Sequence, residues 1–182
     1  PRRVGKSTIV RQFAQREYKS YIMIDFSKAS DEEKGVFNNL SNIDFFFATL
    51  KLIEGTALYE RESVIIFDEV QLYPVARQAI KHLVADGRYD YIETGSLISI
   101  HKNVESIVIP SEEEPINMYP MDYEEFRWAM GDVATMPLLK EMYQKSQSLG
   151  DGVNRKLMLD FRLYMLIGGM PQAVNTYLQT HD

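Results

Sequence analysis

The sequence predicts an α/β fold in which a parallel sheet is flanked by helices, followed by a mostly α-helical segment. Apolar runs typical of buried strands alternate with helical patterns up to Pro120, and only helical patterns follow it. The apolar run at residues 63–67 is continuous and β-branched, which is typical of a parallel strand covered on both faces. We therefore expect a sheet domain over residues 1–120 and a helical segment over residues 121–182.

The expected strands are short apolar segments bounded by polar or turn-forming residues. They cover residues 21–26, 63–67, 89–93 and, after a loop with two prolines, residues near 117–119. The polar residues 27–34 are expected to form a loop, and the acidic triplet at 112–114 to be a solvated loop.

The expected helices have apolar residues at spacings of three and four. They cover residues 7–18, 44–53, 75–86, 122–130, 137–147, 154–167 and 172–180. Asn42 or Asp44 is expected to cap the second of these helices, which Gly55 ends, and Gly87 ends the third.

Composition excludes several classes of function. The 182 residues fit one domain, or one domain and the start of another, and the net charge of −6 gives no footprint for general nucleic-acid or anionic-membrane binding. No apolar run is long enough to span a bilayer. The chain has no cysteine, which excludes disulfides, thiolate zinc sites and cysteine nucleophiles and suits a cytoplasmic protein.

The tetrapeptide Gly5-Lys6-Ser7-Thr8 matches the end of a phosphate-binding P-loop, G-x-x-x-x-G-K-[ST]. In such a loop the glycine lets the backbone approach the phosphates, the lysine reaches the β- and γ-oxygens, and the serine hydroxyl binds Mg²⁺. The glycine that begins the pattern would precede Pro1. Taken alone, the tetrapeptide fits a plain glycine turn before a helix equally well.

A second motif follows the strand predicted at residues 63–67, which ends in Asp68 and Glu69. This is the form of a Walker B motif, in which the first carboxylate helps to hold Mg²⁺ and the second polarises the attacking water. A strand that ends in a solvated acidic turn is the alternative, and the nearby GKST motif favours the nucleotide site. ATP is the expected nucleotide, because the guanine-selecting N-K-x-D and the kinase motifs H-R-D and D-F-G are missing.

A third polar group, Thr94-Gly95-Ser96, follows the strand predicted at residues 89–93. Ligands of open α/β sheets bind at the carboxyl ends of the strands, so one of these residues could contact the γ-phosphate or the attacking water. A simple turn fits the three residues equally well.

Five segments occur in succession: PRRVGKST, VIIFDEVQLYP, YIETGSL, MYPMDYEEF and LIGGMPQAVNTYL. In this the chain resembles the AAA-type P-loop ATPases of bacteria and archaea that carry a C-terminal DUF4143 region. The resemblance implies a P-loop NTPase sheet of the ASCE/AAA type, with ATP and Mg²⁺ as cofactors.

By position, the resemblance assigns phosphate binding to residues 3–8, namely Arg3, Val4, Gly5, Lys6, Ser7 and Thr8. It assigns Mg²⁺ to Ser7 and Asp68, catalysis to Glu69, and a sensor role to Thr94.

The resemblance also has two departures. Residues 109–112 replace a G-R that many relatives carry, so no arginine finger is assigned, and Arg88 and Arg127 are only candidates. The family's first strand precedes the P-loop and lies outside this sequence. We therefore expect the segment alone to be inactive and to bind ATP poorly or not at all, with opening residues that are poorly ordered or displaced.

Three functions stay open. The first is ATP hydrolysis by an AAA-type ATPase coupled to a C-terminal effector region. The second is a nucleotide-dependent switch with negligible turnover. The third is the regulatory ATPase segment of a DNA-acting, nuclease-like protein, where nucleic acid would bind only through the further C-terminal region. No oligomeric state is predicted.

Overall fold

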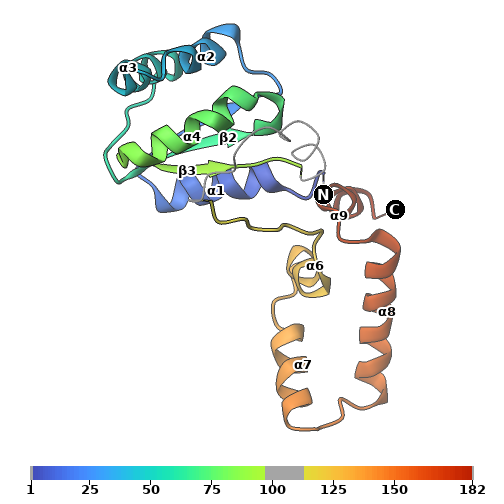
Figure 1. The fold of residues 1–182 in the computed structure, drawn as a ribbon. Coiled ribbons are helices and arrows are strands. Elements are labelled where there is room, and N and C mark those ends of the chain that lie inside the picture. Colours follow the sequence, from blue (N-terminus) through green and yellow to red (C-terminus); the bar gives the residue numbers. More distant parts are fainter. Residues whose placement is uncertain (1, 97–112, 182) are drawn as a thin grey trace. The chain divides into compact units, whose positions relative to one another are not determined.

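The structure is a computed structural model that describes residues 2–96 and 113–181. The chain divides into two compact units, which are treated separately below (Figure 1). One unit is Gly5–Ile116, and the other is Asn117–Asp182 together with Pro1–Val4. Residues 109–112, where relatives carry the G-R element, lie outside the described residues.

The first unit is built on a parallel three-stranded sheet with the order β1-β2-β3. Its strands are β1 (Ser20–Asp25), β2 (Ser63–Asp68) and β3 (Asp90–Glu93). Every residue of the central strand β2 is buried, as its continuous apolar run predicts. In the register of the sheet, Asp25 lies beside Asp68 and Phe67 beside Glu93, so the three strands end along one edge.

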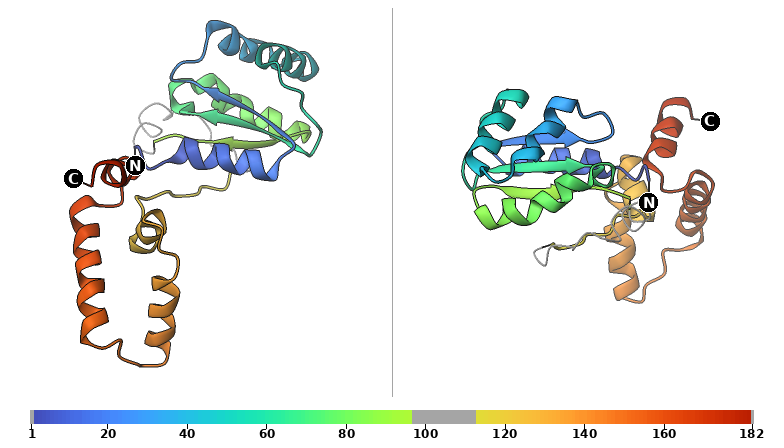
Figure 2. Two further views of the ribbon diagram at one scale, coloured as in Figure 1. Left: turned by 180° about the vertical axis from the view of Figure 1, so that it is seen from behind. Right: turned by 45° about the horizontal axis from the view of Figure 1, so that its top comes forward.

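Helices cover both faces of this sheet, which confirms the predicted fold class (Figure 1). Helix α1 (Lys6–Glu17) packs Ala14 against Val64 and Ile66 on one face. Helices α3 (Ile43–Glu54) and α4 (Pro74–Asp86) cover the other face, where the larger aromatic core lies. Figure 2 shows the sheet between these layers from two further directions.

Residues 27–34 were expected to be a loop, and this expectation is wrong in part. A short helix, α2 (Asp31–Gly35), is capped by Ser30, which accepts a hydrogen bond from the Glu33 N–H at 3.1 Å, while Glu33 bonds back to the Ser30 N–H at 2.6 Å. This capping box stabilises a helical turn that the spacing of apolar residues does not predict. The 3₁₀ helix η1 (Val36–Asn39) follows and inserts Val36 and Phe37 into the core.

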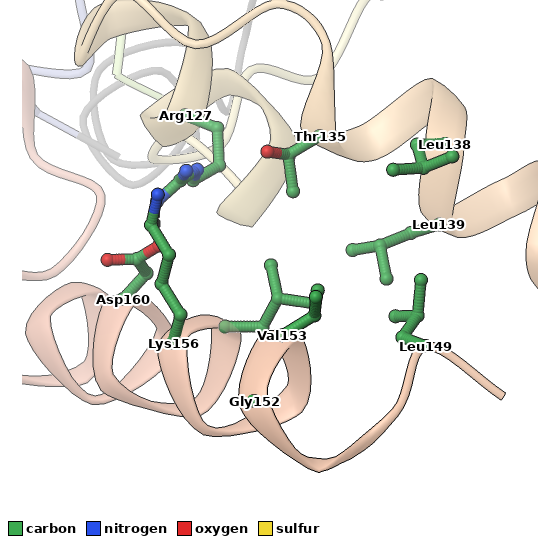
Figure 3. A pocket seen from close by; sticks show the side chains of 10 residues that line it. Arg127, Thr135, Leu138, Leu139, Leu149, Gly152, Val153, Lys156 and Asp160 are labelled. Carbon is green, nitrogen blue, oxygen red and sulfur yellow. Dashed lines mark ion pairs between the residues drawn. The ribbon is translucent and has the colours of Figure 1, made fainter.

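The second unit is helical, as predicted after Pro120. Its helices are α6 (Tyr123–Ala129), α7 (Thr135–Gln144), α8 (Asp151–Ile167) and α9 (Pro171–Thr180). Asp122 caps α6 in a second capping box with Glu125. A cleft of about 310 Å³ lies between α6, α7 and α8, and Figure 3 shows leucine and valine side chains on its one side and Arg127, Lys156 and Asp160 on the other.

The strand expected near residues 117–119 is wrong, because the described residues have no strand there. Two residues further along, Met121 is held by hydrogen bonds to α8 and to the turn that follows it. The Met121 N–H donates to the Gly169 carbonyl at 2.8 Å, and the Tyr164 hydroxyl donates to the Met121 carbonyl at 3.0 Å. A strand needs a paired ladder, and single contacts of this kind leave the segment irregular.

None of the helices in the described part of the chain is both long and apolar enough to cross a membrane.

Candidate nucleotide-binding site

The first turn of α1 carries backbone N–H groups that have no acceptor within the helix. Gly5 is the N-cap residue and has a left-handed backbone (φ 90°, ψ 14°), and the first helical bond runs from the Ile9 N–H to the Gly5 carbonyl at 3.0 Å. The N–H groups of Lys6, Ser7 and Thr8 precede that bond and have no acceptor within the helix. No side chain caps this end and its first turn carries no acidic residue. A helix start of this kind attracts an anion such as a phosphate.

Ser7 and Asp68 meet at the edge of the sheet where β2 ends. The Ser7 hydroxyl donates to Asp68 Oδ1 at 2.8 Å, although the two residues are 61 positions apart. Asp68 is buried, with 4% of its surface exposed. The prediction that the two motifs share one edge of the sheet is therefore confirmed, and the expectation that the opening residues are displaced is wrong for Ser7.

Thr94 joins the ends of β2 and β3. Its hydroxyl donates to Asp68 Oδ1 and accepts a hydrogen bond from the Glu69 N–H at 3.3 Å. Backbone bonds reinforce this link, because the Val70 N–H donates to the Thr94 carbonyl at 3.0 Å and the Thr94 N–H to the Phe67 carbonyl at 2.9 Å. The buried Thr94 hydroxyl thus lies between the two carboxylate-bearing residues that the sequence singled out.

Glu69 occupies an unusual backbone conformation. Its φ of 53° and ψ of 42° place it in the left-handed region, which a residue with a side chain rarely adopts. The turn that follows is the 3₁₀ helix η2 (Val70–Leu72), and it returns the Gln71 amide to the Glu69 carboxylate, where Nε2 donates to Oε2. Strained backbone of this kind is concentrated at functional sites.

The donor set at this edge suits Mg²⁺ better than a transition metal. Ser7 offers a hydroxyl oxygen and Asp68 a carboxylate oxygen, and Mg²⁺ prefers oxygen ligands, usually one or two carboxylates with waters and phosphates. Within residues 2–96 and 113–181, no group of three histidine, cysteine or acidic residues could hold a metal by itself. The residues present therefore fit a magnesium ion that arrives with phosphate.

The other predicted site residues lie as follows. Lys6 is the partly buried first residue of α1, and Thr8 is exposed in its first turn. Arg3 and Val4 belong to the second unit and are therefore described apart from this edge of the sheet.

Both arginine-finger candidates are held by acidic residues of their own unit. Arg88 binds Asp86 and Asp44, each at 2.7 Å. Arg127 lies in the cleft of the second unit (Figure 3), where it binds Asp132 and, at 2.7 Å, Asp160.

The sequence does not predict the ion cluster that lies beside Thr94. Arg77 of α4 donates to Glu93 Oε2 at 2.5 Å and to Glu113 Oε2 at 2.8 Å, and its side chain is only 7% exposed. The expectation that the acidic triplet is merely solvated is therefore wrong for Glu113. Burial raises the pKa of Glu93 to about 7, with Arg77 lowering it and Glu113 raising it further. The partners lie 16 and 36 positions from Arg77, so no local pattern reveals them.

Comparison with known proteins identifies the family. The model of the AAA domain family AAA_14 matches residues 1–127. No curated protein and no solved structure matches the chain. The match spans the helix start at Gly5, the carboxylates that end β2, and Thr94, and it covers well over half of the sequence. The chain therefore belongs to the AAA domain family, which makes it a nucleotide-binding protein of the AAA ATPase type.

Proposed function

We propose that the protein binds ATP with Mg²⁺ and hydrolyses the bond between the β- and γ-phosphates. The observation that carries this proposal is the contact of 2.8 Å between Ser7 Oγ and Asp68 Oδ1, which brings the phosphate-loop motif and the acidic strand end into one site. Neither motif alone would distinguish a nucleotide site from a turn.

The binding step uses the start of α1. The N–H groups of Lys6, Ser7 and Thr8 point their dipoles at the phosphates, and the Lys6 ammonium adds a full positive charge. Arg3 and Val4 extend the loop along the chain and are proposed to complete it. Ser7 Oγ and Asp68 would hold Mg²⁺. Bound Mg²⁺ supplies charge neutralisation at the β- and γ-phosphate oxygens.

The hydrolytic step uses the ends of β2 and β3. Glu69 accepts a proton from the attacking water, whose oxygen forms the new bond to the γ-phosphorus while the bond to the β–γ bridging oxygen breaks, giving ADP and inorganic phosphate. Thr94, whose hydroxyl lies between Asp68 and the Glu69 N–H, is proposed to hold these two groups in register and to sense the γ-phosphate. We further propose a cytoplasmic protein in which turnover moves a C-terminal effector region of the DUF4143 type.

The variants below are made in the full-length protein, and the test of nucleotide binding is a titration of Lys6→Ala with ATP and Mg²⁺. A charged contact to phosphate contributes about 1.5–3 kcal/mol, so the dissociation constant should rise tenfold or more. Lys81→Ala removes an exposed lysine of α4 and serves as the matched control. Equal affinities of the two folded variants would refute the phosphate loop.

Hydrolysis is tested separately with Glu69→Gln, which keeps the size of the side chain and removes its basicity. We expect phosphate release to fall by about 10²-fold or more while ATP binding is kept. Nucleotide binding without measurable turnover in the unmodified protein would instead favour a nucleotide-dependent switch. Salt-dependent DNA binding that ATP modulates would favour a regulatory ATPase of a DNA-acting protein.

A further inference from the structure

Gln71 is a buried amide placed directly against the proposed catalytic carboxylate. It lies in the middle of the 3₁₀ helix η2, with 4% of its surface exposed, and its Nε2 donates to Glu69 Oε2. No other hydrogen bond to the Glu69 carboxylate is found among the described residues, so this is the contact that orients the carboxylate.

The turn that carries Gln71 is fixed at several points. The Leu72 N–H donates to the Glu69 carbonyl at 2.9 Å and the Tyr73 N–H to the Val70 carbonyl at 3.0 Å. Pro74 then begins α4, where its fixed φ suits the first helical position. Together with the Thr94 contacts, these bonds hold Glu69 in its left-handed conformation.

Backbone restraint alone does not orient a glutamate side chain, which has three rotatable bonds and loses considerable rotamer entropy when it is held in one place. An amide donor on one carboxylate oxygen supplies that restraint and leaves the other oxygen as an acceptor. A general base needs this arrangement, because it must keep a lone pair within hydrogen-bond reach of the water it deprotonates.

We propose that Gln71 is a positioning residue for ATP hydrolysis, holding Oε2 of Glu69 so that Oε1 accepts the proton of the attacking water. This inference rests on the proposed function. It predicts that Gln71 acts on the chemical step through Glu69 and contributes nothing to nucleotide binding.

The test compares Gln71→Met, which keeps a long buried side chain without a donor, with Leu72→Ala, which shortens an exposed neighbour in the same turn. We expect Gln71→Met to lower kcat about tenfold, a fraction of the 10²–10⁴-fold that a general base contributes. KM and the ATP dissociation constant should stay within twofold, and Leu72→Ala should leave all three unchanged. Gln71→Asn, whose amide is one methylene shorter, should reproduce the loss in kcat if Gln71→Met does not fold.

A double-mutant cycle separates positioning from a structural role. In the Glu69→Gln background, Gln71→Met should cause no further loss of kcat, because the carboxylate it positions is gone. An equal loss in both backgrounds, or a loss accompanied by weaker ATP binding, would overturn the inference. An increase in kcat would overturn it too, since Gln71 would then restrain Glu69 in an inactive position.

The proposed function fails in a different way. If Glu69→Gln hydrolyses ATP as fast as the unmodified protein, then the assignment of the base is wrong and the role of Gln71 is overturned with it. If Glu69→Gln is inactive and Gln71→Met is fully active, only the inference about Gln71 is wrong.

Discussion

Arg77 Nη1 donates to Glu93 Oε2 at 2.5 Å, in a cluster where the same guanidinium also binds Glu113. The cluster links α4 to the end of β3, where Glu93 directly precedes Thr94. The Oε1 atoms of Glu93 and Glu113 are buried and have no hydrogen-bond partner in the described part of the chain. One guanidinium thus binds two partly buried carboxylates.

Removing the Arg77 guanidinium should destabilise the fold. Arg77→Met leaves two partly buried carboxylates without their counter-ion, and we expect it to lower the free energy of unfolding by about 3–5 kcal/mol in urea denaturation. Lys81→Met, on an exposed position of the same helix, should change it by less than about 0.5 kcal/mol. Similar small effects of both variants would show that the cluster is not a source of stability.

The same cluster predicts a dependence of stability on pH. Burial raises the pKa of Glu93 from its ordinary 4.5 to about 7, so between these values the folded protein binds more protons than the unfolded chain. The contribution of Glu93 to stability is therefore present at low pH and is lost as the pH rises from about 4.5 to about 7. Glu93→Gln removes this ionisation. The free energy of unfolding of the variant, minus that of the unmodified protein, should therefore increase as the pH rises from about 4.5 to about 7.

Thermal denaturation of the two proteins at pH 5, 6, 7 and 8 measures this difference. Glu62→Gln, at an exposed carboxylate, corrects for the loss of one surface charge. A difference between Glu93→Gln and the unmodified protein that stays constant over the window would contradict the prediction.

Gly169 should tolerate no side chain. A Cβ atom there would lie 1.9 Å from the Met121 carbonyl oxygen, which belongs to the backbone and cannot rotate away. We expect Gly169→Ala to destabilise the protein by about 1–3 kcal/mol. Gly152→Ala in α8 is the matched control, because a Cβ there meets no atom within 4 Å, and it should stabilise by about 0.4–1 kcal/mol. Urea denaturation of both variants checks the opposite signs.

The Thr94 hydroxyl should contribute to stability as well as to the site. Thr94→Val keeps the shape of the side chain but leaves the Glu69 N–H and Asp68 Oδ1 each short of a partner. We expect a loss of about 1–3 kcal/mol in the free energy of unfolding. Thr94→Ser keeps the hydroxyl and should lose only about 1 kcal/mol, the value of one buried methyl group. If the serine variant were the less stable one, the hydroxyl would not be the important group.

The sequence predicts most of the first unit because its signals are local. The strand β2 follows from four consecutive apolar positions after a serine, and α3 is capped by Asn42 and Gly55 as expected from their capping preferences. The meeting of Ser7 and Asp68 was also predictable, because parallel strands end at one edge of a sheet and the P-loop precedes a helix that packs on that sheet.

Other features depend on partners that no local pattern contains. The sequence of residues 117–119 resembles a strand, but in the structure these residues do not pair with another strand. The nearby Met121 N–H donates to the Gly169 carbonyl instead. Glu113 looks solvated, but Arg77 lies across from it in the fold. Helix α2 has a readable signal, Ser30 followed by Glu33, which a search for apolar periodicity does not use.

The left-handed backbone at Glu69 has a consequence for evolution. A residue with a Cβ costs about 1–2 kcal/mol in this conformation, whereas glycine or asparagine adopts it readily. Replacing Glu69 by either would remove this backbone cost and the carboxylate at the same time. Selection for folding alone would favour those replacements, so the proposed function predicts that relatives which hydrolyse ATP keep a carboxylate at this position.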